Sequence, residues 1–164
     1  MPPLKTQPMK AGAFGNWRKV NEKFDLTIVK QISEKGVSCV SAVGEILLKS
    51  RNIFVTQAEI LDIIGEPAGI VALGKCLNRF DIADFDEKWH ANYSNDFEIE
   101  FLTSKKNCGV ILKEFGGQAH AVFIKEFDVR FIINDTFDQS CYEMTIEDFD
   151  KVWTGAYIFY GKNE

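Results

Sequence analysis

The chain has 164 residues, of which 46% are hydrophobic; this suits one compact domain and excludes a multidomain machine. Its 24 acidic and 19 basic residues give a formal net charge of −5 without a long block of either sign, which argues against a nucleic-acid-binding protein. No apolar run approaches the ~20 residues of a membrane span, and no signal-peptide pattern is visible, so we expect no membrane insertion.

The N-terminal stretch lacks hydrophobic periodicity and carries prolines and scattered lysines. We therefore predict a flexible leader or linker over residues 1–14 and a single domain over residues 15–164. From Trp17 to Ile32 apolar residues recur at steps of three or four, which predicts one or two helical pieces, ending before Gly36.

Three further helices are predicted next. Apolar residues in the stretch Cys39–Ser50 lie on one side at helical spacing, typical of a buried helix. Thr56 and Glu59 form the pattern of a capping box at the start of a second helix, which Gly65 ends. A third helix is predicted over residues 69–79.

The second half of the chain changes to the period of β-strands. Predicted strands are FEIEFL (97–102), CGVILKEF (108–115), HAVFIKEF (120–127), VRFIIN (129–134) and GAYIFY (155–160). MTIEDFDKVW reads as a short helix with Thr145 as its N-cap. Helices followed by a mostly antiparallel sheet indicate an α+β fold.

Cys39 stands where a helix is predicted to begin, after the candidate N-cap Ser38. A helix N-terminus and a neighbouring imidazolium are two common devices that stabilise a thiolate and so make a cysteine nucleophilic. The sequence contains only two histidines, His90 and His120, so any thiol and imidazole chemistry must use one of them.

His120 opens a predicted strand, and the following strand ends at Asn134 and Asp135. If these two strands form a hairpin through a turn at Asp128, their far ends meet and Asp135 comes beside His120. A carboxylate there would orient the imidazole for a thiol, which predicts Cys39, His120 and Asp135 as a catalytic triad.

A cysteine hydrolase also needs donors for the oxyanion that forms during acyl transfer. One donor would be a backbone N–H near Cys39, and the candidate side-chain donor is Gln31, eight positions upstream.

This ordered set resembles the papain-like superfamily, most of all the bacterial C39 and C39-like peptidases. Those proteins show a glutamine, a cysteine opening a long helix, a histidine opening a strand and an aspartate after the next strand; the matching positions are Gln31, Cys39, His120 and Asp135. The similarity covers roughly residues 28–160. Val40 stands where the family usually has glycine.

The resemblance implies a papain-like fold and a thiol acyl-transfer enzyme that cleaves peptide or isopeptide amides or deamidates glutamine. Small domains of this kind also occur as effector modules of secreted bacterial toxins, which implies a neutralising immunity protein and either a cytoplasmic location or delivery within a larger toxin. A C39-type leader-processing peptidase and a degenerate peptide-binding domain remain alternatives. No cofactor and no metal are expected, because the sequence lacks metal-ligand spacing.

The remaining candidate residues are interpreted as structural. The four scattered cysteines include no Cys-x-x-Cys pair, which argues against zinc-ribbon and thioredoxin-like sites. We expect Cys76 and Cys108 to be reduced and without a base and Cys141 to lie in a loop after Asp135, although the even count leaves two disulfide bridges open. We interpret His90 as a solvated loop histidine. Ser41 is not favoured as the nucleophile, because it lies inside the first turn of the predicted helix rather than at its N-terminus.

Overall fold

The computed structural model describes residues 18–19, 29–32, 38–65, 68–82, 86–93, 99–113, 119–136 and 139–162; the predicted leader over residues 1–14 lies outside them. The helices of the described part are α1 Cys39–Lys49, α2 Gln57–Ile64, α3 Ile70–Phe80, α4 Glu100–Thr103 and α5 Ile146–Val152. The strands are β1 Arg18–Lys19, β2 Glu87–Tyr93, β3 Cys108–Lys113, β4 Ala119–Asp128, β5 Arg130–Asp135, β6 Ser140–Met144 and β7 Trp153–Lys162. None of the helices in the described ranges has the length and apolar character needed to cross a membrane.

Helices α1, α2 and α3 follow the sequence predictions closely. In α2 the Thr56 side chain accepts a hydrogen bond from the backbone N–H of Glu59, and the Glu59 carboxylate accepts one from the backbone N–H of Thr56. Gly65 ends this helix with φ 77°, a left-handed conformation that glycine adopts without a steric penalty. The predicted capping box is therefore confirmed.

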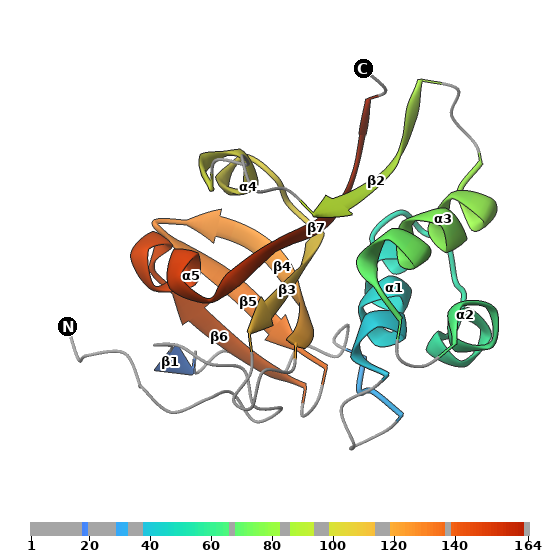
Figure 1. Cartoon of the computed structure of the whole chain (residues 1–164), viewed down its shortest axis with the longest axis horizontal. Coiled ribbons are helices and arrows are strands. Elements are labelled where there is room, and N and C mark those ends of the chain that lie inside the picture. Colours follow the sequence, from blue (N-terminus) through green and yellow to red (C-terminus); the bar gives the residue numbers. More distant parts are fainter. Residues whose placement is uncertain are drawn as a thin grey trace.

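The seven strands form one antiparallel sheet in the order β1-β6-β5-β4-β3-β7-β2. Strands β3 to β6 are joined as successive hairpins, and the last strand, β7, runs between β3 and β2. Figure 1 shows α1, α2 and α3 gathered on one side of this sheet and α5 on the other. The predicted α+β class is confirmed.

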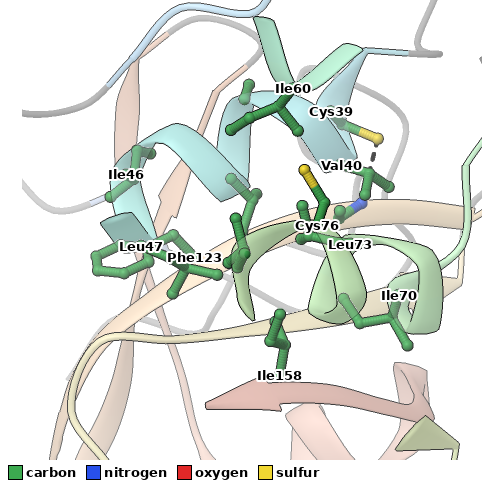
Figure 2. Close-up of a cluster of buried hydrophobic side chains, with 14 of the residues drawn as sticks. Cys39, Val40, Ile46, Leu47, Ile60, Ile70, Leu73, Cys76, Phe123 and Ile158 are labelled. Carbon is green, nitrogen blue, oxygen red and sulfur yellow. Dashed lines mark hydrogen bonds between the residues drawn. The ribbon is translucent and has the colours of Figure 1, made fainter. Parts of the chain in front are cut away.

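Alternating side chains of the sheet build two hydrophobic cores. On β3 and β4, Ile111, Ala121 and Phe123 belong to the core shared with α1, α2 and α3, which we call the helix-side core (Figure 2). Their neighbours in sequence, such as Val110 and Val122, belong to a second core with α4 and α5, the outer core. Because successive side chains of a strand point to opposite faces, a strand buried on both faces is apolar throughout, as CGVIL is.

The helical pieces predicted from Trp17 to Ile32 are wrong wherever the structure describes this stretch. Arg18–Lys19 forms β1, paired with β6, and residues 29–32 are not helical. The backbone N–H of Gln31 donates to the carbonyl of Thr136 at 2.7 Å instead of to a carbonyl four residues earlier. Contacts with distant strands override the helical spacing here.

The strand predicted over residues 97–102 is also wrong in its described part. Residues 100–103 form the single turn α4, in which the N–H of Leu102 donates to the carbonyl of Ile99. Ile99 and Leu102, three residues apart, are both buried in the outer core, and Phe101 packs its ring against Phe159 at a centroid distance of 5.1 Å. Alternation and helical spacing are hard to separate over so short an apolar run.

Two further strands were not predicted. His90 lies in β2, where Trp89 is buried and the other side chains are partly or fully exposed, so the interpretation of His90 as a loop histidine is wrong. Cys141 lies in β6, paired with Asn134 of β5, rather than in a loop. Both strands lie near the ends of the sheet, where one-sided burial weakens the hydrophobic signal of a strand.

Candidate active site

Cys39 is the first residue of α1 and is 4% exposed. Val43 and Leu47, one and two turns further along α1, are fully buried in the helix-side core and hold this helix against the sheet. The backbone N–H of Ala121 in β4 donates to the Cys39 sulfur at 3.5 Å, the bond drawn dashed in Figure 2. The thiol therefore lies where the positive end of the α1 dipole meets a backbone donor of the sheet.

His120 and Asp135 form a fully buried pair. The Nε2–H of His120 donates to Oδ1 of Asp135 at 2.8 Å, and both side chains have 0% exposure. Phe123 pairs with Asn134, so Asp135 comes level with residue 122 and diagonally across from His120. The β4–β5 hairpin, which turns at Val129 with φ 65°, thus brings together the two residues as the sequence suggests.

The pKa of His120 is raised from 6.5 to about 10. Burial, the largest effect, would lower the pKa, but it is outweighed by the charge of Asp135, by the hydrogen bond to Asp135 and by the hydrogen bond and charge of Cys39. With Nε2 on the carboxylate, Nδ1 is the ring nitrogen available to the thiol. The geometry favours a protonated imidazole next to the cysteine.

Gln31 is buried and lies against the residue that follows Asp135. Its backbone N–H donates to the Thr136 carbonyl at 2.7 Å, and its side-chain Oε1 accepts from the Thr136 hydroxyl at 3.1 Å. Gln31 is therefore attached to the end of the strand that carries Asp135.

The remaining candidates lie apart from this group or have structural contacts. Cys76 and Cys108 are buried in the two cores, where burial raises the pKa of both thiols, for Cys108 to about 12. The Ser41 hydroxyl donates to the carbonyl of Ser38 at 3.0 Å, within the first turn of α1. His90 stacks on Phe159. Across the ranges that the structure describes, no three His, Cys, Asp or Glu side chains are grouped as metal ligands would be.

Sequence reasoning missed two groups in contact with these residues, the backbone N–H of Ala121 and the side chain of Thr136. It also missed Gln57, which bonds the backbone of Lys30 and Ile32 on either side of Gln31. Thr136 directly follows Asp135 in the sequence, so its closeness to the site could have been predicted. Gln57 is separated from residue 30 by 27 positions and gives no local signal.

No family model matches the chain. A search of curated proteins found a relative named Cysteine protease effector 1, from Escherichia coli O1:K1:H7, which is 32% identical over 155 residues. The match covers 92% of this chain, and the chain spans 30% of the relative's length.

Three solved structures that share this fold are a protease, a peptidase domain and a C39-like peptidase, each 14–15% identical to the chain in sequence. A C39-like peptidase from Bacillus anthracis has a TM-score of 0.66, with 88% of this chain and 100% of that chain covered. The peptidase domain of Streptococcus ComA, a bi-functional ABC transporter, has a TM-score of 0.62 and coverage of 82% and 97%. A double glycine motif protease from an AMS/PCAT transporter, solved with a leader peptide, has a TM-score of 0.59 and coverage of 99% for both chains.

The sequence and the fold thus point the same way. The resemblance inferred from sequence is confirmed: the chain is similar to a cysteine protease effector and has the papain-like fold of the C39 peptidase domains.

Proposed function

We propose that the chain is a cysteine peptidase in which Cys39 is the nucleophile, His120 the general base and acid, and Asp135 the residue that orients His120. The observation that carries this proposal is the buried His120–Asp135 pair at 2.8 Å, coupled to a thiol at the start of a helix. Gln31 is proposed as the side-chain donor to the oxyanion, together with a backbone N–H in the first turn of α1.

The chemistry follows from these positions. The Cys39 thiolate attacks the carbonyl carbon of an amide, and the oxygen of the tetrahedral intermediate becomes an anion that accepts hydrogen bonds. His120 gives its proton to the departing amine as the carbon–nitrogen bond breaks, which leaves a thioester on Cys39. Water, deprotonated by His120, then attacks the thioester and releases the acid and the thiol.

The substrate class is proposed as a peptide or isopeptide amide, because a solved structure of the same fold is a protease with a leader peptide bound. Deamidation of a glutamine side chain would use the same four residues, with ammonia leaving in place of an amine. The two alternative functions are processing of a leader peptide and peptide binding without cleavage.

Selective alkylation tests the proposed dyad. Iodoacetamide labelling across pH, mapped by mass spectrometry, is expected to modify Cys39 faster at pH 6 than a free cysteine, with Cys141 as an internal reference. His120→Ala should slow labelling of Cys39 roughly tenfold or more, because the imidazolium that stabilises the thiolate is gone. An unchanged rate of Cys39 labelling in His120→Ala would contradict the proposed Cys39–His120 dyad.

A second proposal concerns context: the chain acts as a toxin effector, delivered as part of a larger protein and neutralised by an immunity protein. The supporting observation is the curated relative, a cysteine protease effector of which the chain spans 30%. Expression of the wild type in a bacterial host is expected to arrest growth, and Cys39→Ala is expected to restore it. Equal growth of the two strains would contradict this proposal.

A further inference from the structure

The segment of residues 29–32, which carries Gln31, is held on both sides. In an extended segment the backbone groups of successive residues point to opposite sides. The N–H of Gln31 faces Thr136, whereas the carbonyl of Lys30 and the N–H of Ile32 face Gln57. Two elements distant in sequence therefore meet the same short piece of chain.

Gln57, the first residue of α2, forms one side. Its Oε1 accepts from the N–H of Ile32 at 3.0 Å, and its Nε2 donates to the carbonyl of Lys30 at 2.6 Å. A neighbouring parallel β-strand would make the same two bonds, to the carbonyl of the residue before Gln31 and to the N–H of the residue after it. Gln57 is itself connected to the helix that begins with Cys39, because its backbone N–H donates to the Glu45 carboxylate of α1 at 2.6 Å.

Thr136 forms the other side and determines which way the Gln31 amide is turned. Its carbonyl accepts from the Gln31 backbone, and its hydroxyl donates to Gln31 Oε1 at 3.1 Å. An amide whose oxygen accepts this bond has its NH₂ group on the opposite end of the plane. Thr136 has 0% exposure, as has the neighbouring Asp135, so this contact is shielded from water.

We propose that Gln57 and Thr136 are positioning residues that set the location and the amide orientation of Gln31 for oxyanion binding. The inference rests on the proposed function, since it needs Gln31 to be the oxyanion donor. Gln57 ties the segment to the helix that carries the nucleophile, and Thr136 ties it to the strand that carries Asp135. A donor must be held within a fraction of an ångström of the developing charge to be effective.

Two reagents separate positioning of the donor from reactivity of the thiol. Transfer of the acetyl group of p-nitrophenyl acetate to the Cys39 sulfur passes through an oxyanion and releases nitrophenolate, whereas displacement of iodide from iodoacetamide involves no oxyanion. Rates with both reagents are measured for the wild type, Gln31→Ala, Gln57→Glu, Thr136→Val and Thr136→Ser. Asn78→Asp is the matched control for Gln57→Glu, because the Asn78 amide makes the same two kinds of bond to the backbone of Trp89 in β2.

Gln31→Ala, Gln57→Glu and Thr136→Val are expected to lower the acetylation rate by about tenfold or more and to leave alkylation within about twofold of the wild type. Thr136→Val removes the hydroxyl donor, and Gln57→Glu places a carboxylate oxygen against the Lys30 carbonyl. Thr136→Ser, which keeps the hydroxyl, is expected to match the wild type with both reagents. The control Asn78→Asp is also expected to show wild-type rates with both reagents, even if its free energy of unfolding is lower.

Wild-type acetylation in Thr136→Val and Gln57→Glu would overturn the inference, and so would wild-type acetylation in Gln31→Ala. Equal losses of acetylation and alkylation would also overturn it, because the two residues would then support the fold or the dyad rather than the donor. A Thr136→Ser variant as slow as Thr136→Val would exclude the hydroxyl contact. The proposed function fails on a separate result, namely wild-type alkylation that does not depend on His120.

Discussion

His120 is a buried imidazole whose charge depends on two neighbours. Burial alone would lower its pKa, and Asp135 and Cys39 reverse that effect and raise the pKa to about 10. Removing the carboxylate while keeping the shape and the hydrogen-bond acceptor should therefore expose the effect of burial.

Asp135→Asn is expected to bring the pKa of His120 down from about 10, because the amide oxygen can still accept from Nε2 but carries no charge. NMR titration of the imidazole resonances measures the change. His90 serves as the internal reference in the same spectra, because it lies in β2, which β3 and β7 separate from β4 in the sheet. A His120 titration unchanged by Asp135→Asn would show that the carboxylate does not hold the proton.

The same shift affects stability as a function of pH. A group with a raised folded-state pKa binds its proton more tightly in the folded protein, so its contribution is fully present below its ordinary pKa and is lost as pH rises through the folded value. For His120 that window runs from 6.5 to about 10. Wild-type stability is thus expected to fall across this window more steeply than that of Asp135→Asn.

Urea unfolding at several pH values measures this difference. Cys108, whose pKa is raised from 9.0 to about 12 by burial, also loses its contribution as pH rises through its own range. Its effect is common to both proteins and cancels in the comparison. Parallel stability curves for wild type and Asp135→Asn would contradict the link between this pair and folding.

At the scale of elements, α2 positions Gln57, so the capping box at its start has more than a local effect. Thr56→Ala removes the acceptor of the Glu59 N–H bond and is expected to cost about 1 kcal/mol of unfolding free energy, measured by urea denaturation. Thr103→Ala is the control, because its exposed hydroxyl only bonds a carbonyl three residues earlier in α4. Equal losses in the two variants would exclude the cap as the cause.

Elements with a local signal were predictable from the sequence. Ser38 before an apolar helical run marks the start of α1, the Thr56–Glu59 pair marks α2, and the apolar runs around Asp128 mark the β4–β5 hairpin. The hairpin then determines that Asp135 lies beside His120, which is why these two positions could be inferred together.

Elements that depend on distant partners were not predictable in the same way. Residues 29–32 read as helical, yet their hydrogen bonds go to Thr136 and Gln57, up to 105 positions away. Strand β2 pairs with β7 over its whole length, although Trp89 is its one buried residue. The alternation of Trp89, Ala91 and Tyr93 with polar residues is its local signal, but that signal is weak in so polar a stretch, and the pairing with β7 is not visible in the local sequence.

At the scale of the whole molecule, the candidate site is assembled from two layers. Cys39 comes from the helical layer, and His120 and Asp135 come from the sheet. Their relative placement depends on how closely α1 approaches β3 and β4, and Gly109 lies at this contact. A Cβ at Gly109 would meet Ile158 Cγ2 at 2.8 Å and Val43 Cγ1 at 3.0 Å.

Gly109→Ala is therefore expected to destabilise the protein by about 1–3 kcal/mol, because neither branched side chain can withdraw without moving α1 or β7. The same displacement should slow alkylation of Cys39 under conditions where the variant is fully folded, since the thiol moves relative to His120. Gly161→Ala is the control: its Cβ would meet only the ring of Phe159, at 3.2 Å, near the end of β7. Urea unfolding measures the loss of stability in each variant, and the rate of iodoacetamide labelling measures the effect on Cys39. A Gly109→Ala variant with wild-type stability and wild-type alkylation would show that the spacing between the layers does not govern the site.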